Sequence, residues 1–268
     1  IALFDNENEA FTYPSLWEKR CFSGDARSDY AGSPLRGWAR SIERIWLTDI
    51  PEEAMNINVH GRRVTSPAKG FGRMWDKRYR LRLNDTDVDP RRVVSVWKAA
   101  FPEFWPKGNR VFTSAKAPIA PGTTAVLNLS LPGGLTLATG IMIVYADDTS
   151  FSFMTVEGHM LAGLINFSSF QEDGTTIIQV HPLFRASDPL MELAFRFGAS
   201  NQEDVFWHRT LNNLARRLGF HGHIEQHSKL IDGRLDWSEA GSLWKNAAIR
   251  SSFYMPVHVA NRVIHRKT

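Results

Sequence analysis

The sequence has little cysteine and none of the common catalytic signatures. Cys21 is the one cysteine among 268 residues, so the chain cannot form an internal disulfide. The motifs G-x-S-x-G, H-E-x-x-H and C-x-x-C are absent, and so is a phosphate-binding glycine loop. Their absence excludes the common forms of hydrolase, metalloprotease and nucleotide-dependent enzyme. We therefore expect neither a metal ion nor a cofactor.

Long apolar runs are missing as well. The longest, residues 135–146, contains threonine and glycine and spans about a dozen residues, whereas a membrane helix needs about 20. The first residues lack the basic start and the apolar stretch of a secretory signal. Together with the single cysteine, these features predict a soluble cytoplasmic protein that does not span a membrane.

The charge is mildly basic and spread along the chain. The formal net charge is +4, and the sequence contains no nucleic-acid recognition motif. Net charge alone bears on solubility and non-specific association, so we do not expect a nucleic-acid partner. Apolar residues make up 43% of the chain, with nine Trp and seventeen Phe, which predicts a packed core and leaves aromatic side chains to line a pocket.

An ordered series of elements begins near residue 70. Residues 77–83 alternate charged and apolar side chains, as in a strand buried on one face. Asp89-Pro90 then starts an amphipathic helix, and Ser200 with Glu203 reads as a capping box for a long second helix that ends at Gly219. Five strands with short connections are expected between the two helices, at 123–131, 135–145, 151–156, 164–170 and 175–184.

This order predicts an α+β fold in which a curved antiparallel sheet wraps a long C-terminal helix, the helix-grip arrangement. An antiparallel sheet has to bury one face, and the long helix is the natural cover. We assign residues 70–219 to this domain, residues 1–69 to an aromatic-rich N-terminal extension, and residues 220–268 to a C-terminal extension packing on the domain. A sheet that curls around a helix often encloses a ligand cavity.

Several segments resemble the START-like superfamily, also called SRPBCC, which includes polyketide cyclases and pollen allergens. The likeness is carried by residues 122–129, 151–159, 185–193 and 203–211, and it points to a bacterial branch known only as a domain of unknown function. It covers a little over half of the chain and implies a helix-grip fold around an internal apolar cavity. Relatives place acidic residues soon after the Gly158-His159 pair, whereas residues 160–165 are apolar here, so chemistry by such acids is not expected.

Candidate site residues follow from these placements. Polar groups that could move protons in a pocket are His159, His181 and Tyr145. Residues expected to contact a ligand are Trp97, Phe101, Trp105, Phe153, His159, Gln179, His181 and Arg185. Each has a structural alternative: a turn histidine, a solvent-facing strand, a core aromatic, or an arginine paired with a nearby acid.

Three functions remain open on the sequence. The first is binding of an apolar or amphipathic small molecule, such as a lipid or a polyketide-like compound, in an internal cavity. The second is a cyclase or isomerase that uses pocket acid and base groups, and the sequence does not decide whether the pocket is catalytic. The third is an assembly or scaffold role, in which the two extensions bind a protein partner or a second copy of the chain.

Overall fold

The computed structural model describes residues 44–47, 51, 54–83, 88–113, 118–131 and 136–254, all within the compact unit Gly37–Thr268. Predictions about Cys21, the turn at residues 132–134 and most of the N-terminal extension lie outside these residues. The strands are β1 (Val64–Thr65), β2 (Met74–Leu83), β3 (Arg110–Thr113), β4 (Thr124–Ser130), β5 (Thr136–Ala146), β6 (Ser150–Val156), β7 (Leu161–Glu172), β8 (Thr175–Ala186) and β9 (Gly222–Asp232). The helices and helical turns are η1 (Pro67–Lys69), α2 (Pro90–Ala99), η2 (Phe101–Phe104), α3 (Pro189–Ala194), η4 (Phe195–Ala199), α4 (Ser200–Leu218) and η5 (Trp237–Lys245).

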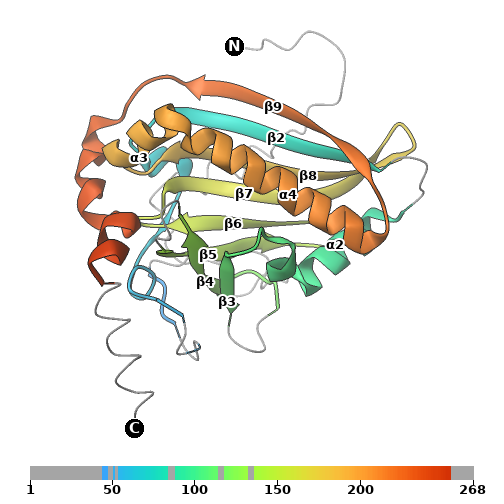
Figure 1. Cartoon of the computed structure of the whole chain (residues 1–268), viewed down its shortest axis with the longest axis horizontal. Coiled ribbons are helices and arrows are strands. Elements are labelled where there is room, and N and C mark those ends of the chain that lie inside the picture. Colours follow the sequence, from blue (N-terminus) through green and yellow to red (C-terminus); the bar gives the residue numbers. More distant parts are fainter. Residues whose placement is uncertain are drawn as a thin grey trace, which may run out of the picture. The chain divides into compact units, whose positions relative to one another are not determined.

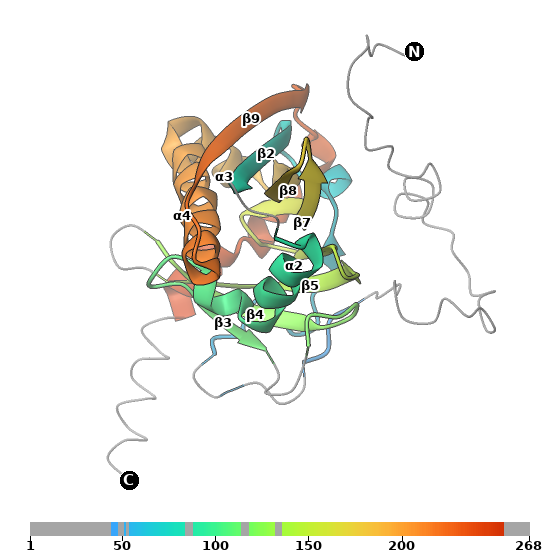
Figure 2. The same cartoon turned by 90° about the vertical axis from the view of Figure 1, so that its right-hand side faces the viewer.

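The strands form one antiparallel sheet in the order β3-β4-β5-β6-β7-β8-β2-β9, with β1 paired to β6 (Figure 1). Figure 2 shows the sheet bending from β9 and β2 down to β4 and β3, with α4 along its open side. The α+β helix-grip fold predicted from the sequence is therefore confirmed, with the five expected strands present as β4 to β8 and the long helix after them. The short strand β3, which pairs with β4, was not predicted.

Local sequence explains the helix boundaries, with one correction. Asp89 and Asp188 both accept backbone N–H groups at helix starts, from Arg91 at 2.9 Å and from Met191 at 3.0 Å. The capping box expected at Ser200 is wrong, because α4 follows α3 through the kink at η4 and Ser200 already has helical geometry. At the other end Gly219 adopts φ +85°, the left-handed geometry of a helix stop.

Strand alternation divides the sheet into two faces. Phe151, Phe153, Phe167 and Val180 point toward α4 and join the main buried cluster. Val126, Met142 and Val156 point the other way and pack with Ile45, Ala54 and Val59 from the N-terminal part of the chain. We call the first side the inner face and the second the outer face.

The segments on either side of residues 70–219 contribute to the same sheet. β1 pairs with Thr155 and Val156 at the end of β6, beyond the residues that pair with β7, and β9 pairs with β2 along almost its whole length. Among the described residues, no helix is both long enough and apolar enough to cross a membrane.

Candidate functional site

The space between the inner face and α4 is filled by aromatic rings. Four of the residues predicted to contact a ligand meet there, namely Trp97, Phe101, Trp105 and Phe153. Phe101 lies 5.5 Å from Trp105 and 6.3 Å from Phe153 between ring centroids. The structure therefore brings these four side chains together in one mainly apolar interior.

Two polar groups in this interior are unusual. The indole rings of Trp97 and Trp105 are 0% and 6% exposed, and neither Nε1–H has a hydrogen-bond partner among the described residues. A buried indole N–H usually finds an acceptor. Trp207, on α4 in the same cluster, does so by donating to Glu203 Oε1 at 3.4 Å. In this interior, the indole N–H groups of Trp97 and Trp105 therefore have no described acceptor, whereas that of Trp207 does.

Gln179 and His181 do not line this interior. Their neighbours Ile178 and Val180 belong to the inner cluster, so strand alternation turns Gln179 and His181 to the outer face. There His181 Nε2 lies 3.1 Å from Asp76 Oδ1, and Gln179 accepts a hydrogen bond from Arg80 at 2.8 Å. The sequence placed them on β8 correctly but could not say which face α4 covers.

His159 and Tyr145 lie at opposite ends of β6. His159 follows β6 in a tight turn, where its Nδ1 accepts the Leu161 N–H at 3.0 Å. Burial lowers the pKa of His159 to about 4, so the imidazole is neutral at pH 7. Tyr145 pairs with Ser152 near the start of β6 and donates a hydrogen bond to Asp147 at the surface. The three acid–base candidates therefore share no cavity among the described residues.

Arg185 is occupied by structural contacts. Its Nη1 donates to the carbonyls of Gly72 at 2.6 Å and Arg234 at 2.9 Å, while Nη2 pairs with Asp232 at 2.6 Å. These bonds tie β8 to β9 and to the loops beside them. Arg185 is therefore paired with an acid, as in the structural alternative given above. The partner is Asp232, however, and not an acid close to Arg185 in the sequence.

A buried polar cluster escaped the sequence analysis. Lys77 Nζ lies 3.0 Å from Glu203 Oε2 and 2.7 Å from Asp204 Oδ1, and Tyr79 donates to the same Asp204 oxygen at 2.6 Å. Burial raises the pKa of Glu203, whereas the bonds from Lys77 and Tyr79 outweigh burial and lower the pKa of Asp204. No role was predicted for Lys77 from the sequence. It is an odd-numbered residue of β2, and the odd-numbered residues face α4. Tyr79 and Leu81 follow Lys77 at intervals of two residues and are buried against α4. Their spacing could have indicated that Lys77 faces α4 as well.

Comparison with known proteins adds one family match. Residues 91–212 match a sequence family described as a domain of unknown function, DUF1990. The match runs from α2 to the middle of α4 and includes the aromatic residues of the interior. A search of curated protein sequences finds no match.

Solved structures with weak similarity include three of different origin. Protein Ms6760 from Mycobacterium smegmatis shares 13% identity over 54% of this chain and 90% of its own, with a TM-score of 0.40. The di-domain ARO/CYC protein StfQ of the steffimycin biosynthetic pathway shares 12% identity over 55% of this chain and 52% of its own, with a TM-score of 0.43. Major latex-like protein 151 from Panax ginseng shares 15% identity over 52% of this chain and 99% of its own, with a TM-score of 0.35.

The fold assignment depends on the strand order and the helix of this chain. The sheet curves around α4 in the order given above, and this arrangement confirms the helix-grip fold that the START-like resemblance implies. The chain thus has a START-like helix-grip fold, whose residues 91–212 match the DUF1990 domain of unknown function.

Proposed function

We propose that this protein binds an apolar or amphipathic small molecule, of lipid or polyketide-like type, between the inner face of the sheet and helices α2 and α4. The observation that carries the proposal is the pair of buried indole N–H groups at Trp97 and Trp105 that have no acceptor in the described structure. Leaving a buried donor unsatisfied costs about 1–3 kcal/mol. A ligand carbonyl, ether or hydroxyl oxygen would remove that cost.

The chemistry of the interior selects the rest of the ligand. Its walls are aromatic and aliphatic side chains, and Phe101, Phe151 and Phe167 pack edge-to-face or stacked in its centre. An apolar skeleton gains free energy on leaving water for such surroundings, at about 25 cal/mol per Å² of apolar surface. A ligand with one or two oxygens on an apolar body fits these groups, whereas a charged ligand does not.

Entry requires that rings move, because side chains fill the interior in the conformation described. Trp105 and Phe206 pack at 5.1 Å between η2 and α4, and Phe206 is only half-buried. Asn213 on α4 donates to the Phe104 carbonyl at 2.9 Å and closes the same seam. We infer that a ligand enters between η2 and α4, because displacing the half-buried ring of Phe206 would expose Trp105.

The proposal is tested with Nile red, a neutral apolar dye that carries a carbonyl acceptor. Wild-type protein is expected to bind the dye, and Trp105→Phe to bind it about five- to tenfold more weakly, because one hydrogen bond is lost. Trp207→Phe is the matched control, since its N–H already serves Glu203. It should not weaken binding.

Two results would reject the proposal. One is wild-type protein that leaves Nile red emission unchanged and shows only the polypeptide mass by native mass spectrometry after gentle purification. The other is dye binding that is equally tight in Trp105→Phe and Trp97→Phe, because neither indole N–H would then take part.

A further inference from the structure

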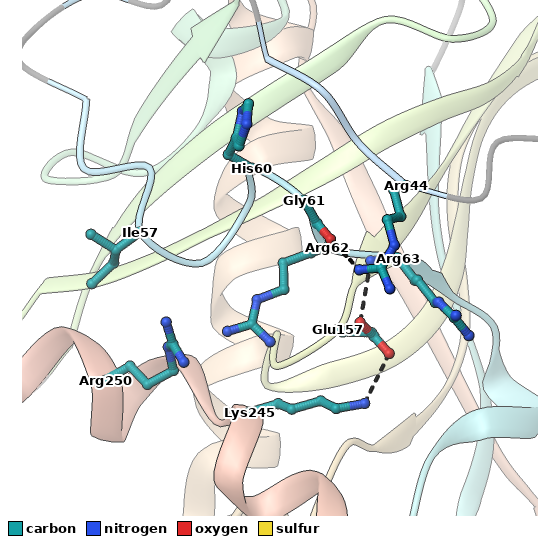
Figure 3. A pocket seen from close by; sticks show the side chains of 9 residues that line it. All are labelled: Arg44, Ile57, His60, Gly61, Arg62, Arg63, Glu157, Lys245 and Arg250. Carbon is teal, nitrogen blue, oxygen red and sulfur yellow. Dashed lines mark hydrogen bonds and ion pairs between the residues drawn. The ribbon is translucent and has the colours of Figure 1, made fainter.

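Five basic side chains and one carboxylate line an open cavity of about 590 Å³ beside the segment that covers the outer face (Figure 3). They come from three distant parts of the chain: the N-terminal segment, the turn after β6, and the region from η5 into the helical residues 247–254. The charged residues are Arg44, Arg62, Arg63, Lys245, Arg250 and Glu157.

The cavity carries a strong positive excess. Five cations against one carboxylate leave four positive charges, which equals the formal net charge of the whole chain. Glu157 is itself engaged, since it pairs with Lys245 at 2.9 Å and accepts the backbone N–H of Arg63 at 3.2 Å. Its carboxylate therefore neutralises Lys245 and leaves the arginines in excess.

Several guanidinium groups have donors to spare. Arg62 donates no side-chain hydrogen bond to any described residue, and Figure 3 shows its guanidinium reaching between Glu157 and Arg250. Arg250 uses only its Nε, which donates to Asn58 Oδ1 at 2.8 Å. Burial and the repulsion of Arg250 lower the pKa of Arg62 despite the opposing charge of Glu157, so the site holds like charges close together.

Buried hydrogen bonds hold together the segments that surround the cavity. Asn58 is fully buried and donates to the Ala138 carbonyl at 2.8 Å while accepting from Arg250, so it joins the N-terminal segment, β5 and the helical residues 247–254. Gly158, next to Glu157 in the chain, has φ +86°, and its carbonyl accepts a hydrogen bond from Ala247 N at 2.8 Å. A Cβ on Gly158 would lie 2.0 Å from the Lys245 carbonyl oxygen.

We propose that this cavity binds the phosphate group of a small phosphorylated molecule. Arginine forks match phosphate oxygens in pairs, and a phosphate carries about two negative charges near pH 7. A surplus of four positive charges suits such an ion better than a single carboxylate does. The volume lies in the usual range for small-molecule sites, about 300–1,000 Å³. This site is separate from the aromatic interior and does not depend on the function proposed above.

Pyrophosphate is the probe, measured by isothermal titration calorimetry on the full chain at low salt. Wild-type protein is expected to bind it, and Arg62→Gln to bind about tenfold more weakly or worse, because a charge-assisted contact is lost. Arg62→Gln breaks no hydrogen bond to a described residue, so folding should be retained. Arg63→Gln is the second variant, and Arg92→Gln, which removes an exposed arginine on α2, is the matched control that should bind as wild type.

A second arm separates the source of the phosphate. Co-sedimentation with phosphatidylcholine vesicles containing phosphatidic acid, lost in Arg62→Gln, would identify a lipid headgroup, and pyrophosphate binding alone would identify a soluble ligand. The proposal is overturned if wild type binds neither probe, or if both Arg62→Gln and Arg63→Gln bind pyrophosphate as wild type does. Nile red binding should be unchanged in Arg62→Gln, so the two proposals fail independently.

Discussion

His159 shows at the scale of one residue how burial sets protonation. Its imidazole is 7% exposed and holds the turn between β6 and β7 through Leu161, while Ser187 donates to its carbonyl oxygen. Because burial penalises the imidazolium, the pKa falls to about 4. A histidine in that state is a structural acceptor at pH 7 and a source of acid sensitivity below it.

The stability of the protein should therefore depend on His159 below pH 6.5. The unfolded chain binds a proton there near pH 6.5, whereas the folded chain does so only near pH 4, so the free energy of unfolding falls as the pH drops through this window. The full loss is on the order of 3 kcal/mol and is complete below pH 4. Urea unfolding of His159→Asn, which keeps an acceptor for Leu161, should show a flatter pH dependence by about that amount.

The same replacement at an exposed position is the control. His227→Asn, on β9, should keep the wild-type pH dependence. Parallel curves for wild type and His159→Asn between pH 7 and pH 4 would contradict this account of the turn.

At the scale of elements, α4 is attached to the sheet by apolar packing and by one buried ion cluster. Leu211 and Leu214 pack into the inner cluster, while Lys77 on β2 bonds Ser200, Glu203 and Asp204 in the first turns of α4. Buried ion pairs add little net stability, but removing one partner leaves the other charge uncompensated.

Replacing Lys77 should loosen α4 from β2. Lys77→Met leaves two carboxylates without their cation and is expected to lower the free energy of unfolding by about 3–5 kcal/mol, measured by urea denaturation. Lys229→Met, at an exposed position of β9, is the control and should change it by less than about 0.5 kcal/mol. An effect of Lys77→Met as small as that of the control would show that the cluster does not secure the helix.

The elements were predictable because hydrophobic period and turn residues are local. The alternation in β2, the helix start at Asp89-Pro90 and the helix stop at Gly219 all act over a few residues, and each is found where expected. The cap expected at Ser200 is absent because η4 leads from α3 directly into α4. Ser200 therefore already has helical backbone geometry, whereas a capping residue would be extended. A local pattern cannot report that connection.

The sites were harder to predict because they depend on which distant segments meet. Trp97 and Trp105 were placed correctly in the interior, since a helix covering a sheet must bury its aromatic stripe. Gln179 and His181 lie on the outer face and not in the interior. Alternation along a strand shows which residues share a face, but it does not show which face α4 covers. Arg62 and Arg250 are too far apart in sequence to suggest a shared cavity.

At the scale of the whole described molecule, the two faces of one sheet carry two chemistries. The inner face with α2 and α4 is mainly apolar and holds unsatisfied indole donors, whereas the outer side, covered by the N-terminal segment and the helical residues 247–254, holds a cluster of arginines. The segments outside residues 70–219 thus supply the basic residues of the second site, and β9 adds a strand to the sheet beside β2.

The most direct measurement follows the indole N–H signals of the nine tryptophans in a ¹H–¹⁵N correlation spectrum during titration with Nile red. Single Trp→Phe variants assign each signal. We predict that the Trp97 or Trp105 signal moves downfield as its donor gains an acceptor, while the exposed Trp237 and Trp244 stay in place. If the dye binds while the Trp97 and Trp105 signals remain where they are in the free protein, the interior is not the binding site.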